Sequence, residues 1–190
     1  MRVVSGSARG RSLKLPKDPK GIRTTRPMMD KIKEALFDVL ASLGVQAERV
    51  LDLYAGSGSL GIEALSRGAT WCDFVERDAF AVRAIRENLE TVGFSELARV
   101  HQTQVETAIR SSREPYDLIL FDPPYADPEI HALLEALSSS GAVMDGTIVA
   151  VGHTPRIVLP DQLGQMQRLR LRCHGDSCFS VYDVVMDGES

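Results

Sequence analysis

From residue 49 onward, short apolar stretches alternate with amphipathic ones, and this alternation constrains the fold more than any other feature of the sequence. Strands buried in a parallel sheet carry near-continuous apolar runs, and the helices that connect them carry one apolar face. The expected strands are 49–54, 70–76, 98–102, 116–121 and 147–151. The expected helices between them are 58–67, 79–92, 105–111 and 128–137. This order predicts an α/β fold with a parallel sheet covered on both faces.

The two ends of the chain depart from this alternation. The runs 166–173 and 178–186 have no helix between them, so they predict an antiparallel hairpin at the sheet edge, which makes seven strands in all. Before the sheet, apolar residues recur at spacings of three and four over 28–43, which is typical of an amphipathic helix. The turn at 6–10 predicts a small N-terminal hairpin.

Composition excludes several classes of protein. The chain has 190 residues, 44% of them hydrophobic, which is enough to bury a core without a disulfide or metal. It has no apolar run long enough to span a membrane, and its N-terminus lacks the apolar core of a secretory signal. Three widely spaced cysteines favour a reducing cytoplasm over a disulfide framework. The cysteines and histidines also lack metal-ligand spacing, so no metal is expected.

Charge is distributed unevenly along the chain. Residues 1–33 contain ten Lys or Arg and two Asp, a net charge of +8, while residues 34–190 contain 22−10 = 12 basic and 26−2 = 24 acidic groups, a net charge of −12. A basic segment on an acidic body is typical of a surface that binds a polyanion. We therefore expect a basic arm over 1–27 and the α/β domain over 28–190. A solvated tail without a partner is the alternative.

A glycine-rich turn follows the first expected strand. Gly56-Ser-Gly58-Ser-Leu-Gly61 matches G-x-G-x-x-G, in which glycines let the backbone approach a ligand and the N–H groups of a helix start face it. About twenty residues later, Glu76 ends the second strand, where a carboxylate can accept both hydroxyls of a ribose. The pair predicts a cofactor that contains a nucleoside. An ordinary loop carboxylate is the alternative for Glu76.

Asp52, four residues before Gly56, indicates which cofactor the turn binds. It places a negative charge where the pyrophosphate of a dinucleotide would lie, and like charges at that range disfavour binding. S-adenosylmethionine carries an ammonium and a sulfonium group and no phosphate, so it fits this position. A strand-end carboxylate with only a structural role is the alternative.

A second motif, Asp122-Pro-Pro-Tyr125, follows the fourth expected strand, at the edge where open α/β sheets bind ligands. The two prolines fix φ and remove two backbone donors, so the Asp122 carboxylate and the Pro123 carbonyl become convergent acceptors. Such acceptors can hold both N–H groups of an exocyclic amine and turn its lone pair toward a methyl donor, while Tyr125 offers a flat face to a purine. The alternative is a Pro-Pro turn that only ends a strand.

These motifs and their flanking segments resemble the bacterial 16S ribosomal RNA guanine-N2 methyltransferases, the RsmD family. The matching segments are 23–27, 33–37, 52–69 and 122–125, with Gly175-Asp-Ser177 and Tyr182 near the end of the chain. The resemblance implies a Rossmann-like, class I methyltransferase that moves a methyl group from S-adenosyl-L-methionine to the 2-amino group of one guanine. The implied partner is 16S rRNA or a small ribosomal subunit under assembly, and the enzyme is expected to be a cytoplasmic monomer.

The resemblance also implies roles for individual residues. Those expected to bind the cofactor are Asp52, Tyr54, Ala55, Gly56, Ser57, Gly58, Glu76, Arg77, Gln104 and Val105. Those expected to hold the guanine are Asp122, Pro123, Pro124 and Tyr125. From charge and not from the resemblance, those expected to contact RNA are Arg9, Arg11, Arg23, Arg26 and Lys33, with a second stripe of Arg168, Arg170 and Arg172 along one face of a strand. Three positions depart from the family pattern: Gln104 replaces an acidic residue, Lys33 an arginine and Gly152 a glutamate.

Three other functions fit parts of the sequence. A DNA adenine-N6 methyltransferase also uses Asp-Pro-Pro-Tyr, but 190 residues leave no room for a separate target-recognition domain. An NAD-dependent oxidoreductase fits the glycine turn but leaves Asp52 and Asp122 unexplained. A non-catalytic RNA-binding protein with a vestigial cofactor site fits the basic arm.

Overall fold

The computed structural model describes residues 1–17, 30–124 and 129–186, and the expected alternation of strands and helices is present in them. The strands are β1 (Arg49–Leu53), β2 (Trp71–Glu76), β3 (Ala98–Gln102), β4 (Leu118–Phe121), β5 (Ile148–His153), β6 (Gln162–Leu163), β7 (Met166–His174) and β8 (Ser177–Val184). The helices are α1 (Asp30–Ser42), α2 (Ser59–Ser66), α3 (Ala79–Val92), α4 (Val105–Ser111) and α5 (Ile130–Ser138), with a 3-10 turn at Ser95–Leu97. The expected ends of α3 and α4 are confirmed.

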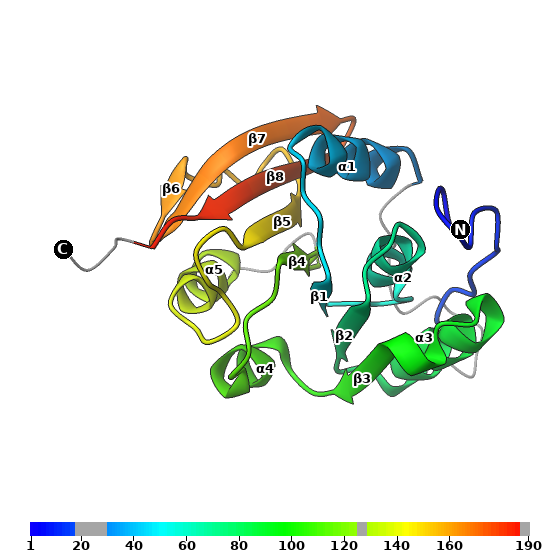
Figure 1. The fold of residues 1–190 in the computed structure, drawn as a ribbon. Coiled ribbons are helices and arrows are strands. Elements are labelled where there is room, and N and C mark those ends of the chain that lie inside the picture. Colours follow the sequence, from blue (N-terminus) through cyan, green and yellow to red (C-terminus); the bar gives the residue numbers. More distant parts are fainter. Residues whose placement is uncertain (18–29, 125–128, 187–190) are drawn as a thin grey trace.

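One sheet connects these strands in the order β3-β2-β1-β4-β5-β8-β7-β6 (Figure 1). The first five strands are parallel, and β8 pairs antiparallel with β5. The mostly parallel sheet with an antiparallel C-terminal hairpin is therefore confirmed. The sheet has eight strands instead of seven, because Gln162–Leu163 pairs with the start of β7. A segment this short carries no periodicity from which it could be predicted.

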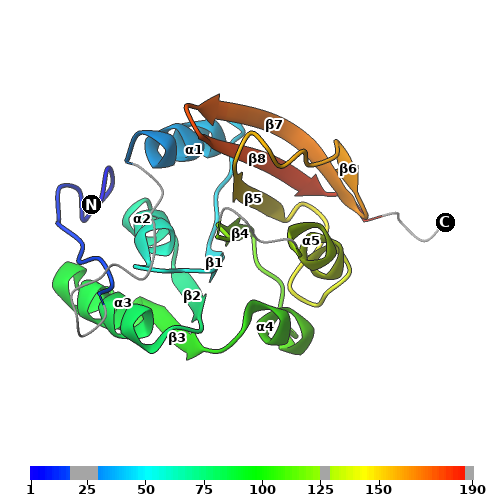
Figure 2. The ribbon, with the colours of Figure 1, turned by 180° about the vertical axis from the view of Figure 1, so that it is seen from behind.

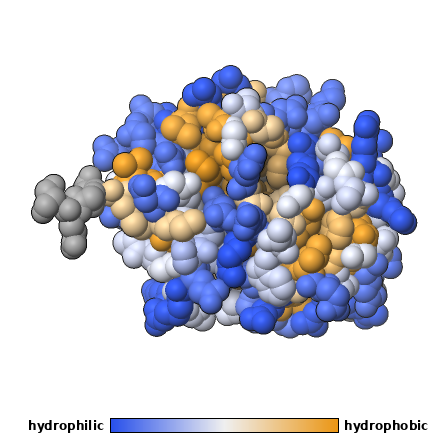
Figure 3. Space-filling model, viewed as in Figure 1, coloured by the Kyte–Doolittle hydropathy of each residue, from blue (hydrophilic) through white to orange (hydrophobic). Residues whose placement is uncertain are grey.

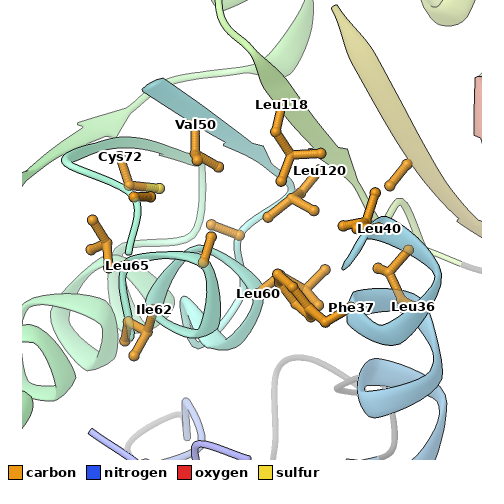
Figure 4. Packing of buried hydrophobic residues seen from close by; sticks show 14 of the residues in the cluster. Leu36, Phe37, Leu40, Val50, Leu60, Ile62, Leu65, Cys72, Leu118 and Leu120 are labelled. Atoms are coloured by element: carbon orange, nitrogen blue, oxygen red, sulfur yellow. The ribbon is translucent and has the colours of Figure 1, made fainter. Parts of the chain in front are cut away.

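The two faces of the sheet have separate hydrophobic cores. Helices α1, α2 and α3 pack on one face, and α4 and α5 pack on the other (Figures 1 and 2). In the first core, Phe37 and Leu40 of α1 lie near Leu60 of α2 and Leu120 of β4 (Figure 4). On the outer surface shown in Figure 3, hydrophilic residues predominate and hydrophobic ones are interspersed. Within the described ranges, no helix is long and apolar enough to cross a bilayer.

The N-terminal segment is a minimal antiparallel hairpin, as expected, in which three backbone hydrogen bonds join residues 1–3 to residues 10–13. A single antiparallel bridge joins Arg2 to Ser12. The N–H groups of Val4 and Ser5 donate to the Glu63 carboxylate of α2, at 2.7 and 2.9 Å, so these groups pair with a side chain and not with a neighbouring strand. The expected boundary at 27/28 lies outside the described residues.

Strand β7 contains a bulge that the sequence did not predict. Arg168 pairs with Tyr182, but Arg170 pairs with Val181, so one extra residue is inserted between them. Arg168 consequently lies on the α5 side, where it donates to the Leu159 carbonyl at 2.8 Å, while Arg170 shares the opposite face with Val181. The expectation that all three arginines of β7 share one face is wrong, because a bulge reverses the alternation of side chains.

A disulfide joins Cys173 to Cys178 across the β7–β8 hairpin. The two residues are five apart in sequence, and the turn at Gly175 makes them directly opposed cross-strand neighbours. The expectation of a chain without disulfides is wrong for these two cysteines, because spacing in sequence does not show which residues become cross-strand neighbours.

Candidate active site

The carboxyl ends of β1, β2, β3 and β4 lie along one edge of the sheet, because these strands are parallel neighbours. The chain runs from β1 outward to β2 and β3 and then returns to place β4 on the other side of β1. This reversal of direction is the topological switch point, outside which open α/β sheets form a crevice for ligands. The loops after β1 and β4 therefore flank the expected site.

The glycine turn after β1 requires glycine for two different reasons. Gly56 and Gly58 have positive φ angles of 57° and 77°, which glycine adopts without steric cost. Gly61 lies inside α2, and a Cβ atom there would lie only 2.4 Å from the ring of Phe74 in β2. The third glycine therefore brings α2 close against the sheet. Tyr54 also has a positive φ, 59°, an uncommon conformation for a residue with a side chain.

Asp52 lies beneath this turn and is only 1% exposed. Its Oδ2 accepts a hydrogen bond from the Gly61 backbone N–H at 2.9 Å. Burial, with smaller contributions from the charges of Asp122 and Glu76, raises the pKa of Asp52 to about 8. The carboxyl group therefore holds its proton at neutral pH without a ligand, whereas the sequence argument treated it as a fixed negative charge. A cation bound beside it would favour the ionised form.

Glu76 connects the end of β2 to the glycine turn. Its Oε2 accepts from the Gly56 N–H and its Oε1 accepts from the Asp78 N–H, both at 2.9 Å. These bonds hold the carboxylate at the mouth of the switch point. Each oxygen can still accept one further hydrogen bond.

A pocket of about 330 Å³ opens beside Glu76. Its lining residues are Tyr54, Val75, Glu76, Arg77, Thr103, Gln104, Val105, Glu106, Pro124 and Glu129. It therefore brings together five of the ten expected cofactor residues with one residue of the Asp-Pro-Pro-Tyr motif. The other five, which belong to β1 and the glycine turn (Asp52, Ala55, Gly56, Ser57 and Gly58), do not line it.

Four lining residues were not expected from the sequence. Thr103 precedes Gln104 in the loop after β3, and Glu106 lies in the first turn of α4. Val75 comes from inside β2 and Glu129 immediately precedes α5. No sequence motif marks Val75 or Glu129, because only the packing of the chain brings them to the pocket.

Asp122 extends from the end of β4, next to the end of β1. Its N–H donates to the Leu53 carbonyl at 3.4 Å, and its side chain is half-buried. Burial raises the pKa of Asp122 to about 7. Pro123 is buried, Pro124 is exposed, and Tyr125 lies outside the described residues. The charges of Asp122 and Glu76 both contribute to the raised pKa of Asp52, so this edge disfavours phosphate and favours a cationic ligand.

The residues expected to contact RNA have different environments. Arg9 and Arg11 are exposed on the N-terminal loop, and Arg23 and Arg26 lie outside the described residues. Lys33 is fully buried: its Nζ donates to the Arg2 carbonyl at 2.7 Å and lies 3.4 Å from a carboxylate oxygen of Glu63. The expectation that Lys33 contacts RNA phosphate is therefore wrong in this structure. The charge of Lys33 is neutralised inside the protein.

The fold and this site define the class of the protein. Three features surround the switch point: a glycine turn after β1, an acidic residue at the end of β2 and Asp-Pro-Pro after β4. Together they are typical of a Rossmann-like, class I methyltransferase. The chain belongs to the family described as conserved hypothetical protein 95, whose model matches residues 1–183.

Known proteins similar to the chain agree with this assignment. Ribosomal RNA small subunit methyltransferase D of Escherichia coli K12 is 30% identical over 190 residues, which cover 100% of this chain and 93% of that protein. The structure of a hypothetical protein of Thermus thermophilus is 31% identical, with a TM-score of 0.81 and coverage of 97% and 99%. An RNA methyltransferase of Salinibacter ruber, solved with S-adenosyl-L-homocysteine, shares the fold at 18% identity and a TM-score of 0.65, with coverage of 85% and 95%. The family resemblance found in the sequence motifs is confirmed.

Proposed function

We propose that this protein transfers the methyl group of S-adenosyl-L-methionine to the exocyclic 2-amino group of a guanine in 16S rRNA. The observation that carries the proposal is the convergence of the Glu76 pocket and the Asp122-Pro-Pro segment at one switch point. The name of the Escherichia coli relative supports the choice of ribosomal RNA as substrate.

The residues of the pocket fit the cofactor chemically. The free acceptor positions of Glu76 suit the two hydroxyls of a ribose, and the side-chain carbonyl of Gln104 suits the amino group of an adenine. The carboxyl group of Asp52 suits the positively charged methionine end. S-adenosyl-L-methionine supplies the electrophilic methyl group when it is bound.

The Asp122-Pro-Pro segment positions the amine. The Asp122 carboxylate and the Pro123 carbonyl accept its two N–H groups, which localises the nitrogen lone pair and stabilises the positive charge that develops during attack. Because burial raises the pKa of Asp122 to about 7, both forms of its carboxyl group are populated at neutral pH. The ionised form is the better acceptor. The reaction is a direct in-line transfer without a covalent enzyme intermediate: the bond from nitrogen to the methyl carbon forms as the bond from sulfur to that carbon breaks, and the nitrogen then releases one proton to water.

The partner is 16S rRNA or a small subunit under assembly, held by the exposed arginines of the N-terminal loop. A guanine must leave its stack to reach Asp122, which costs less in a loop than in a duplex. The resemblance to the family implies a monomer as the active form.

The test uses rRNA from cells that lack the protein. Purified enzyme and labelled S-adenosyl-L-methionine are incubated with naked 16S rRNA, with small-subunit particles and with plasmid DNA, and the products are digested to nucleosides. We expect N2-methylguanosine in an rRNA sample and no N6-methyladenosine in DNA. The opposite pattern would establish the adenine-N6 alternative, and absence of calorimetric heat with the cofactor would establish a vestigial site.

A further inference from the structure

One aromatic ring is exposed near the candidate active site. Phe80 lies in the first turn of α3, four residues after Glu76, and is 42% exposed. The other exposed large apolar side chains in the described ranges are all aliphatic. A single exposed apolar side chain is common on protein surfaces, so Phe80 indicates a ligand only together with the groove and the charges that surround it.

Phe80 forms part of a groove between α3 and the N-terminal segment. The groove has a volume of about 390 Å³ and is lined by Lys14, Leu15, Pro16, Lys17, Phe80, Arg83, Ala84 and Glu87. Phe80, Arg83, Ala84 and Glu87 share one face of α3, because they are spaced three and four residues apart. A groove of this size accommodates a small organic group.

The charge of the groove is positive. Three cationic side chains (Lys14, Lys17 and Arg83) face a single carboxylate, Glu87. Lys14 and Arg83 lie 3.0 and 3.1 Å from Glu87 oxygens, yet their side chains remain 68% and 81% exposed. These exposed cations can contact an anion as well as Glu87. An aromatic ring among cations is the combination with which proteins bind single-stranded nucleic acid.

A buried asparagine holds one wall of the groove in place. Asn88 has no exposed surface, and its Oδ1 accepts from the Lys14 N–H at 2.8 Å while its Nδ2 donates to the Lys14 carbonyl at 3.0 Å. The same Nδ2 donates to the Ser57 carbonyl of the glycine turn at 2.9 Å. The segment opposite Phe80 is therefore fixed to α3 and to the cofactor turn before any ligand binds.

We infer that this groove binds an unpaired base of the RNA substrate, stacked on Phe80, with the neighbouring phosphates contacted by Lys17 and Arg83. The inference rests on the proposed function and adds a second RNA contact to it. Because α3 starts directly after the pocket residues Glu76 and Arg77, the Phe80 end of the groove lies at the same edge of the sheet as the cofactor pocket. Paired bases expose no free face, so the groove selects single-stranded segments.

Binding of a fluorescent single-stranded oligo(A) RNA, about 12 nucleotides long, to the full chain tests the groove. Stacking on an aromatic side chain accounts for about 1–3 kcal/mol per base, so Phe80→Leu should bind about 5- to 150-fold more weakly. Phe80→Tyr should bind normally. Lys17→Gln should reduce the slope of log affinity against log salt by about 0.7, whereas Phe80→Leu should leave that slope unchanged.

Met144→Ala is the matched control, because Met144 is 38% exposed and precedes β5, at the opposite edge of the sheet. The inference is overturned if Phe80→Leu binds the single strand as the control does, or if the same variant loses equal affinity for duplex RNA. Methylation of 16S rRNA by the unmodified protein is measured in parallel. If the unmodified protein methylates 16S rRNA but Phe80→Leu binds the single strand normally, only the base-binding role of the groove is overturned. If the unmodified protein does not methylate 16S rRNA, the proposed function is overturned.

Discussion

At the scale of single residues, the site is governed by the desolvation of carboxyl groups. Asp52 and Asp122 both have pKa values raised by burial, to about 8 and about 7. A raised pKa means that ionisation is costly until a cation or a donor compensates for it. Ligand binding and ionisation are therefore coupled at both positions.

Asp122→Asn should lower the rate of methyl transfer by at least about a hundredfold, because an amide stabilises the developing positive charge less than a carboxylate does. Cofactor affinity should change much less, since the pocket residues around Glu76 remain. Single-turnover methylation with 16S rRNA, together with calorimetric titration of the cofactor, measures both quantities. A variant with a near-normal rate would exclude Asp122 from the reaction.

Cofactor affinity should depend on pH through Asp52. A cation binds the ionised form of Asp52. With a pKa of about 8 in the free protein, the ionised fraction of Asp52 rises about tenfold between pH 6 and pH 7. We therefore expect affinity for S-adenosyl-L-methionine to rise about tenfold over this interval. Asp52→Asn should bind weakly and with a flatter pH profile, as measured by calorimetry in matched buffers. An identical pH profile in the variant would show that Asp52 does not titrate on binding.

The same group makes the ligand-free protein less stable as pH rises. Its pKa in the folded state lies above the unfolded value of 3.8, so the folded chain binds more protons between about pH 4 and pH 8. Asp52 should lower the free energy of unfolding by at most about 1.4 kcal/mol per pH unit in this window. Urea unfolding at pH 5 and pH 8 should show a smaller decrease for Asp52→Asn than for the unmodified protein.

At the scale of elements, apolar periodicity predicted the helices and the parallel strands, because burial on one or two faces is a local pattern. The bulge in β7 and the two-residue strand β6 were missed, because they depend on pairing with another segment. The N-terminal hairpin was predicted from its turn, but its attachment to α2 was not. The N–H groups of Val4 and Ser5 donate to Glu63, which is far away in sequence.

Packing of α2 against β2 should depend on Gly61. Gly61→Ala would place a methyl group 2.4 Å from the Phe74 ring, and overpacking of this kind costs about 1–3 kcal/mol of stability. Phe74→Leu in the same chain should recover part of the loss, so the two changes should be non-additive in urea unfolding. Strict additivity of the two changes would argue that the contact does not limit this packing.

At the scale of the whole molecule, the N-terminal segment is anchored by a buried ion pair. Lys33 of α1 and Glu63 of α2 have fully buried side chains, and Glu63 also binds the N-terminal loop and Arg67. Burial lowers the pKa of Lys33, with the charge of Glu63 acting in the opposite direction. Residues 1–17 of the basic segment are therefore joined to α1 and α2 by contacts with Lys33 and Glu63.

Lys33→Met should destabilise the protein by about 3–5 kcal/mol, because it leaves the Glu63 carboxylate buried without its partner. Where the variant still folds, its salt dependence of RNA binding should equal that of the unmodified protein. The double change Arg9→Gln with Arg11→Gln should instead reduce the slope of log RNA affinity against log salt concentration by about 1.4–1.8, since both side chains are exposed. A reduced slope for Lys33→Met would show that the lysine reaches RNA after all.

Local chemistry in the sequence determined the order of strands and helices, the glycine turn and the Asp-Pro-Pro segment, because each is encoded in neighbouring residues. Only the tertiary structure decided that Lys33 is buried, that Glu129 lines the pocket and that Asp52 holds its proton at neutral pH. Accessibility and pKa depend on how much water the rest of the chain removes from a group. Residues far away in sequence set that quantity, so no local pattern can reveal it.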